Sequence, residues 1–100
     1  LIMGDIFILT SNREGLPVAL LEGMYNGLIG LSYDIGGISD IIINNKNGYL
    51  FNFGDIKKIS DRIIFLNKNR IKIERMKKEA IKMAKDKNGK IDDLINIINK

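Results

Sequence analysis

Residues 6–22 read IFILTSNREGLPVALLE, and this stretch decides the fold class. Its first four residues, Ile6–Leu9, form a continuous apolar run, which is typical of a strand buried on both faces of a parallel sheet. After a polar loop, Pro17 occupies a position that favours the start of a helix, because its missing N–H would have no partner in the first turn. We therefore predict an α/β fold that opens with a buried strand, a loop and a helix ending at Asn26-Gly27.

The remaining segments continue this pattern and then become helical. We predict a strand over residues 28–32, a turn over 34–37, a short helix capped by Ser39 or Asp40 that runs to Ile43, and a strand over 49–53. From Asp55 onward the apolar residues recur with helical spacing, which predicts amphipathic helices separated at Asn67-Lys68-Asn69 and at Asn88-Gly89. Their apolar stripes hold Ile56, Ile59, Ile63 and Leu66 in the first, Ile73, Met76, Ala80 and Met83 in the second, and Ile91, Leu94, Ile95 and Ile98 in the third.

The composition excludes several kinds of chemistry. The 100 residues are 45% hydrophobic, enough for one compact layered unit, but they include neither cysteine nor histidine. Thiol nucleophiles, disulfide frameworks, imidazole bases and the usual zinc ligands are therefore absent, and we expect neither a metal site nor a cofactor. No apolar run approaches the roughly 18 residues that a membrane span needs, and no secretory leader is recognisable, so we expect a soluble cytoplasmic protein. Because the chain begins at Leu1, within what looks like the end of one element, we expect further sequence upstream.

Charge is distributed unevenly along the chain. Residues 1–56 hold two basic and six acidic side chains (net −4), whereas residues 57–100 hold 14 and six (net +8), which together give the overall charge of +4. A cluster of lysine and arginine can bind nucleic acid or an anionic membrane, but it is also the ordinary composition of solvated helix faces. Aromatic side chains do not alternate with the lysines, as they would in a stacking platform, so we do not expect nucleic acid as the partner.

The loop between the first strand and the first helix is the candidate ligand site. In open α/β sheets, ligands bind outside the carboxyl ends of the strands. The backbone N–H groups of Gly15, Leu16 and Val18 would point into this crevice together with the positive end of the helix dipole, while Pro17 has no N–H to contribute. This arrangement suits a phosphate or a pyrophosphate group.

Two carboxylates flank the same segment. Glu14 precedes the predicted helix and Glu22 lies within it, and the helix rises about 7–8 Å between Pro17 and Glu22. Carboxylates are poor partners for an anion, but they accept strong hydrogen bonds from sugar hydroxyl groups. The pair can therefore flank a diphosphate, with a hexose at one end and a ribose at the other.

Each of these residues also has a simpler interpretation. Glu14 can be an acid of a surface loop, and Glu22 can be an ordinary exposed position on a helix. Arg13 either contacts phosphate or pairs with a neighbouring acid. Gly36-Gly37 either forms part of a phosphate loop or marks a turn with unusual backbone angles, and Gly30 within a predicted strand marks a weak point, a bulge or a close approach. Local spacing alone does not choose between these alternatives.

Several segments together resemble a known family. They are Asp5-Ile6-Phe7-Ile8-Leu9-Thr10-Ser11, Arg13-Glu14-Gly15-Leu16-Pro17, Leu20-Leu21-Glu22-Gly23-Met24, Asn26-Gly27, Asp34-Ile35-Gly36-Gly37-Ile38, Asp40-Ile41 and Asn47-Gly48-Tyr49-Leu50-Phe51. This set, which spans roughly residues 5–66, is similar to the retaining GT-B glycosyltransferases of the glycogen-synthase-like group 1 family. The resemblance implies a partial Rossmann-like C-terminal domain, with a parallel sheet flanked by helices and a helical C-terminal tail. Residues 1–66 would be its donor-binding half, and residues 67–100 its C-terminal amphipathic helices.

The E-x7-E motif of that family is matched by Glu14 and Glu22. The resemblance implies that Glu14 contacts hydroxyl groups of the donor sugar and is catalytic only by positioning it, while Glu22 contacts the nucleotide ribose. The backbone after Glu14 would help to hold the sugar and the diphosphate. The implied donor-binding residues are therefore Glu14, Gly15, Leu16, Pro17, Val18 and Glu22.

The implied reaction is retaining transfer of a hexosyl group from a nucleoside-diphosphate sugar to a glycan or lipid-linked acceptor. The acceptor would be bound by an N-terminal domain that this chain lacks, so we expect the fragment to be inactive alone. Peripheral association with an anionic membrane, at the inner face of the cell membrane, is compatible with this reaction. Two alternatives stay open: a basic module that binds anionic membrane or nucleic acid on an α/β scaffold, and a truncated remnant without catalytic activity.

Overall fold

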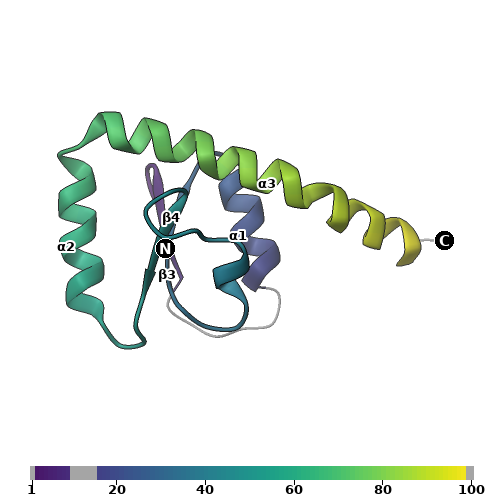
Figure 1. Ribbon diagram of the computed structural model, residues 1–100, viewed down its shortest axis with the longest axis horizontal. Coiled ribbons are helices and arrows are strands. Elements are labelled where there is room, and N and C mark those ends of the chain that lie inside the picture. Colours follow the sequence, from purple (N-terminus) through teal and green to yellow (C-terminus); the bar gives the residue numbers. More distant parts are fainter. Residues whose placement is uncertain (1, 10–15, 99–100) are drawn as a thin grey trace.

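The computed structural model describes residues 2–9 and 16–98, and the side chains of residues 4–9 and 18–87. The elements in these residues are, in chain order, β1 (Ile2–Met3), β2 (Ile6–Leu9), α1 (Leu16–Tyr25), β3 (Ile29–Tyr33), the 3-10 helix η1 (Ile38–Asp40), β4 (Gly48–Phe51), α2 (Ile56–Asn67) and α3 (Arg70–Ile98). Figure 1 shows a small sheet with helices around it and α3 running along the whole length of the molecule. The predicted α/β fold with a helical C-terminal tail is confirmed.

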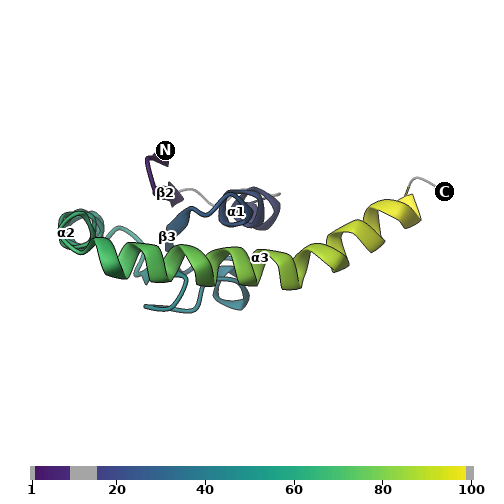
Figure 2. The same ribbon diagram turned by 90° about the horizontal axis from the view of Figure 1, so that it is seen from above.

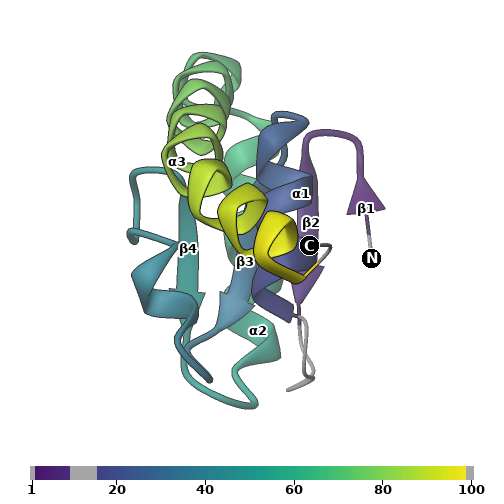
Figure 3. The same cartoon turned by 90° about the vertical axis from the view of Figure 1, so that its right-hand side faces the viewer.

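The four strands form one sheet in the order β1-β2-β3-β4, and Figure 3 shows them side by side. β2, β3 and β4 are parallel, with Phe7 opposite Gly30 and Gly30 opposite Gly48. This confirms the predicted parallel sheet, with strand ends that differ from prediction by one or two residues. β1 was not predicted from the sequence. It pairs antiparallel with β2 at the edge of the sheet. A strand of two residues is too short to show any hydrophobic period in the sequence.

Side chains of the strands enter two apolar clusters on opposite faces of the sheet. One cluster holds Phe7 with Leu20, Leu21 and Met24 of α1 and with Ile38, Ile41 and Ile42 around η1. The other holds Ile6, Ile29, Leu31, Tyr33 and Tyr49 of the strands with Ile59 and Leu66 of α2. Ile6 and Phe7 are neighbours in β2 yet enter different clusters, as alternation along a strand requires. Helices therefore cover both faces of the sheet, as predicted.

α3 joins the two clusters. Ile73 and Met76, in its first half, pack with the α2 cluster, whereas Ala80 and Ala84 pack with the α1 cluster. Figure 2 shows the helix crossing the molecule and continuing beyond the sheet toward its C-terminal end. Ile73, Met76 and Ala80 lie on the predicted apolar stripe. Its fourth member, Met83, is partly buried against the α1 cluster, and the buried Ala84 was not predicted.

The prediction of two separate helices after Asn69 was wrong, because α3 is continuous from Arg70 to Ile98. The predicted break at Asn88-Gly89 lies inside it. A glycine within a helix costs only about 1 kcal/mol relative to alanine, and the lysines and the leucine around it are good helix formers. The predicted break at Asn67-Lys68-Asn69 is confirmed: α2 ends at Asn67, and the Asn69 side-chain Nδ2 donates to the carbonyl oxygen of Phe65 at 2.7 Å.

Two smaller predictions also need correction. The short helix after β3 is a 3-10 turn that begins at Ile38, so Ser39 and Asp40 lie inside it rather than capping it; its N-cap is Gly37, with a φ of 79°. Ile56 has the right angular position for the stripe of α2 but is 67% exposed. Ile56 is the first residue of α2, and only residues farther along the helix reach the core.

Gly30 marks a close approach rather than a bulge. It pairs in regular register with Phe7 on one side and Gly48 on the other. A Cβ at Gly30 would lie 3.0 Å from the Leu20 Cδ1 and 3.3 Å from the Ile42 Cδ1. The glycine therefore lets α1 and the η1 segment pack directly on the middle strand.

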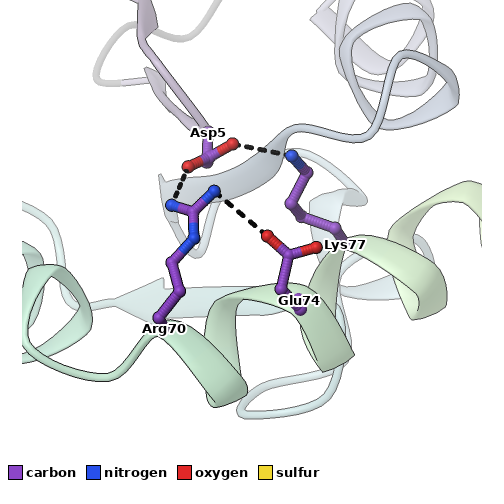
Figure 4. Close-up of polar contacts among 4 residues, drawn as sticks. All are labelled: Asp5, Arg70, Glu74 and Lys77. Atoms are coloured by element: carbon purple, nitrogen blue, oxygen red, sulfur yellow. Dashed lines mark hydrogen bonds and ion pairs between the residues drawn. The ribbon is translucent and has the colours of Figure 1, made fainter.

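A charged cluster fastens α3 to the turn between β1 and β2 (Figure 4). One carboxylate oxygen of Asp5 accepts from Arg70 at 2.6 Å and the other from Lys77 at 2.7 Å. The second terminal nitrogen of Arg70 lies 3.1 Å from Glu74. Hydrogen bonds from Lys77, and next from Arg70, lower the pKa of the Asp5 carboxyl. Asp5 precedes β2, so this cluster lies at the amino edge of the parallel strands, opposite the edge where ligands usually bind.

Candidate functional site

The strand and the helix on either side of the candidate ligand loop are both present. β2 ends at Leu9, and α1 begins at Leu16 and packs back against the sheet. The loop between them, residues 10–15, lies outside the described residues, and with it lie the predicted site residues Glu14 and Gly15 and the neighbouring Arg13. The described part of the site is therefore α1.

α1 begins with backbone N–H groups that have no partner within the helix. Leu16 and Pro17 belong to its first turn, so Pro17 lies one residue later than predicted but still among the positions whose N–H has no intrahelical partner. The remaining N–H groups of that turn point out of the helix end along the dipole. This end of α1 follows the carboxyl end of β2 in the chain.

Glu22 lies on the outer face of α1. Leu20 and Met24 are fully buried against the sheet, whereas Val18 is 54% exposed and Tyr25 is 51% exposed. Helical periodicity places residues 18, 22 and 25 on one face, and the Glu22 side chain is exposed as well. Within the described residues its carboxylate has no hydrogen bond or ion pair, so it is available as an acceptor.

A second loop leaves the same edge of the sheet beside the first. β3 is parallel to β2 and adjacent to it, so the segment after Tyr33 starts at the carboxyl edge. There Gly36 and Gly37 are exposed and have φ values of 51° and 79°. A Cβ at Gly37 would meet nothing within 4 Å, so backbone angle rather than packing requires the glycine. The predicted turn is confirmed, while a phosphate-loop role for Gly36-Gly37 stays a prediction.

The basic half of the chain places four cations on one exposed face of α3. Arg75, Lys78, Lys82 and Lys85 are all exposed and follow a helical spacing of three to four residues. None of them forms an ion pair or hydrogen bond with the described residues, in contrast to Lys77, which is bound to Asp5. We refer to these four residues as the α3 basic stripe.

Among the described residues, no helix is long and apolar enough to cross a membrane. No group of three or more Asp and Glu side chains in the described part of the chain could hold a metal ion.

Comparison with known proteins identifies the family. The sequence profile of the family "Glycosyl transferases group 1" matches residues 1–83. The chain belongs to this family. N-acetyl-alpha-D-glucosaminyl L-malate synthase of Bacillus anthracis is 35% identical to this glycosyltransferase chain over 69 residues, which are 69% of the chain and 18% of that enzyme. Sulfoquinovosyl transferase SQD2 of Arabidopsis thaliana is 42% identical over 57 residues, 54% of the chain and 11% of that enzyme. The chain thus spans less than a fifth of either relative.

Solved structures confirm the fold. A Staphylococcus aureus TarM variant, in complex with Fondaparinux, alpha-GlcNAc-glycerol and UDP, superimposes with a TM-score of 0.79 and 27% identity over 96% of the chain and 20% of TarM. The C-terminal domain of the group 1 glycosyl transferase LpcC from Francisella tularensis gives a TM-score of 0.72 at 24% identity, covering 84% of the chain and 43% of that domain structure. The chain therefore has the Rossmann-like α/β fold of GT-B glycosyltransferases.

A groove on the outer side of β4 was not predicted from the sequence. Arg62 of α2 lies over the ring of Tyr49 in β4, with its Cζ 4.5 Å from the ring centroid. In the sequence, Arg62 is one of the polar residues off the apolar stripe of α2, and Tyr49 is a strand residue. Because the two are 13 positions apart and in different elements, no local pattern indicates that they meet.

Proposed function

We propose that this chain is the donor-binding part of a glycosyltransferase that moves a hexosyl group, with retention, from a nucleoside-diphosphate sugar to a glycan or lipid acceptor. The observation that carries the proposal is the position of Glu22 on α1, the helix after the parallel strand β2 and eight residues after Glu14, in a chain of this family. Its side chain is exposed and has no hydrogen bond or ion pair with the described residues. The UDP in the TarM complex supports a nucleoside-diphosphate donor.

In this proposal, three groups of the protein each bind a different part of the donor. Glu22 accepts hydrogen bonds from the ribose hydroxyls, and Glu14 accepts them from the hexose. The N–H groups of Gly15, Leu16 and Val18 hold the sugar and the diphosphate between them, where the helix dipole favours negative charge. Pro17 leaves one N–H out of this set, and Val18, one turn before Glu22, gives the exposed face of α1 an apolar surface beside the carboxylate.

In this proposal Glu14 acts by positioning. Retention means that the bond from the anomeric carbon to the leaving phosphate breaks and the bond to the acceptor hydroxyl forms on the same face of the sugar. A carboxylate that fixes the sugar hydroxyls holds the anomeric carbon in reach of both oxygens. We assign it neither an acid, a base nor a nucleophile role.

The proposed acceptor is a glycan or a lipid-linked glycan, and it would be bound outside this chain. Support comes from the names of two relatives. An Escherichia coli relative is a galactosyltransferase acting on GlcNAc-diphosphoundecaprenol, and a Bacillus subtilis relative is a poly(glycerol-phosphate) alpha-glucosyltransferase. The chain covers 17% and 12% of these enzymes, so the acceptor of the whole protein is part of the proposal.

The test uses the full-length protein with Glu14→Gln and Glu22→Ala. A hydrogen bond to a charged group contributes about 1.5–3 kcal/mol, so each change should lower kcat/KM for the donor by about tenfold or more. Glu74→Ala, which removes an exposed glutamate of α3 at a distance from α1 in the chain, is the matched control and should leave the donor kinetics unchanged. Unchanged kinetics in both the Glu14 and the Glu22 variant would show that these two residues do not bind the donor.

The α3 basic stripe favours a second function, peripheral binding to an anionic membrane. Each lysine or arginine near such a surface contributes about 1 kcal/mol at physiological salt, and the stripe offers four that no described acid neutralises. Co-sedimentation with phosphatidylglycerol vesicles should fall in a Lys78→Gln, Lys82→Gln double variant and at high ionic strength, while Glu22→Ala should leave it intact. Equal sedimentation of the double variant and the wild type would exclude the stripe.

A further inference from the structure

A groove of about 840 Å³ runs along the free edge of the sheet, between β4, α2 and the start of α3. β3 separates β4 from β2, so the groove lies on the far side of the sheet from the β2–α1 site. The described residues that line it come from the segment before β4, from β4 and from the two later helices. Those used below are Asn45, Tyr49, Lys58, Asp61, Arg62, Phe65 and Lys72.

Arg62 is held in the groove by two aromatic rings. Its Cζ lies 4.5 Å from the centroid of Tyr49 and 5.2 Å from that of Phe65. Stacking of this kind fixes the plane of a guanidinium group and leaves the N–H groups at its rim free to donate. Arg62 forms no hydrogen bond or ion pair with the described residues. Its fork of donors is therefore pre-oriented and unused, and such a fork fits a phosphate or carboxylate group.

Further donors line the same groove. Lys72 donates to the Oδ1 of Asn45 at 2.8 Å, and the Tyr49 hydroxyl donates to the same oxygen at 3.1 Å. These bonds orient Asn45, whose amide nitrogen has no partner among the described residues. Lys58 pairs loosely with Asp55 at 3.4 Å, and its side chain is 71% exposed. Among the described residues, three cations and one carboxylate, that of Asp61, line the groove, which gives these residues a net charge of +2 (3 − 1).

We propose that this groove binds a phosphate-bearing chain, with Arg62 as its anchor. A groove of this volume exceeds what one phosphate fills, and its cations are spread over two helices, so a single carboxylate or phosphate would leave most of them unneutralised. A chain that repeats a phosphate satisfies Lys58, Arg62 and Lys72 together, and its counterions are released on binding. This inference does not rest on the proposed donor site, and either can fail without the other.

The test is the affinity of the full-length protein for short-chain inorganic polyphosphate, measured by isothermal titration calorimetry. We expect Arg62→Gln to weaken binding about tenfold and to make the dependence of log K on log salt shallower by about one. Arg62→Lys keeps the charge but loses the planar fork, so its affinity should lie between those of the wild type and Arg62→Gln. Lys57→Gln is the matched control, because Lys57 is an exposed lysine of α2 that does not line the groove, and it should change affinity less than about twofold.

Competing ligands show whether the groove prefers a chain of phosphates to a single phosphate or to a neutral chain. A second variant covers the case in which Arg62→Gln does not fold. Orthophosphate should compete only at much higher concentration, and a neutral maltooligosaccharide should not bind. Should Arg62→Gln unfold, Lys58→Gln decides, because that side chain is mostly exposed and its loss should still weaken binding severalfold. The proposal is overturned if the wild type does not bind polyphosphate, if orthophosphate or the neutral chain binds as tightly, or if Lys57→Gln weakens binding as much as the groove variants do.

Discussion

Gly48 touches the backbone of Gly30: a Cβ built on Gly48 would lie 2.4 Å from the Gly30 carbonyl oxygen. The two residues face each other in the register of β3 and β4. A real Cβ never comes so close to a backbone atom, so any other residue at position 48 would have to push the strands apart. The edge strand β4, and with it the groove, depends on this contact.

Gly48→Ala should therefore be strongly destabilising. Forced overpacking of this kind costs about 1–3 kcal/mol, and here the neighbour is backbone that cannot rotate away. Urea unfolding of the protein would measure the loss. Gly54→Ala is the matched control: its φ of 85° strains any other residue, but a Cβ there would meet nothing within 4 Å, so it should cost less. Equal losses would show that the contact with Gly30 is unimportant.

The Asp5 cluster predicts a pH dependence of stability. Lys77 and Arg70 lower the pKa of the folded Asp5 carboxyl, so its contribution is fully present above the unfolded pKa of about 4. That contribution should be lost as the pH falls through the lower, folded pKa. We expect Asp5→Asn to unfold more easily than the wild type at pH 7, with the gap closing as the pH falls below about 4.

Asp61→Asn is the control for this pH series, because Asp61 is exposed and has no ion pair with the described residues. Its stability should follow that of the wild type at every pH. Thermal unfolding between neutral pH and pH 2 gives all three curves. A gap for Asp5→Asn that stays constant with pH would contradict the assignment of the effect to ionised Asp5.

Asn47 should hold the loop before β4 through its buried side chain. Its Oδ1 accepts from the Ile43 N–H at 2.8 Å, and its Nδ2 donates to the Ile41 carbonyl at 3.0 Å. Asn47→Ala leaves both backbone groups without this partner, and an unsatisfied buried group costs about 1–3 kcal/mol. Asn52→Ala, at an exposed position, should change the free energy of unfolding by less than about 0.5 kcal/mol. Equal small losses would mean that water replaces the Asn47 side chain.

Much of this fold could be predicted from local sequence patterns. The apolar run of β2 and the helical period of α1 follow from nearest neighbours, and the same period explains why Glu22 is exposed while Leu20 and Met24 are buried. The continuity of α3 could not be predicted, since the helical penalty of one glycine is small beside the hydrogen bonding of the turns around it. The period of the apolar residues predicts which face of a helix is buried, but it predicts poorly where the helix ends.

Local sequence patterns could not predict contacts between elements that are far apart in the chain. The sequence shows Asn44 to Gly48 as a turn rich in asparagine, but only the folded chain shows that Asn47 is the buried one. In the same way, the groove around Arg62 requires three segments to meet. The candidate site at the start of α1 could be proposed because its residues are consecutive. It stays a prediction, since Glu14 and Gly15 lie outside the described residues.

The most direct test of the donor grip compares two ligands, a nucleoside diphosphate and the corresponding nucleotide sugar, by calorimetry on the full-length protein. If Glu22 binds ribose and Glu14 binds the sugar, Glu22→Gln should weaken both ligands, and Glu14→Gln should weaken only the nucleotide sugar, each by about tenfold. The donor pair is first chosen by thermal shift from UDP-, GDP- and ADP-sugars. Binding of both ligands that is unchanged in both variants would contradict the proposed donor site.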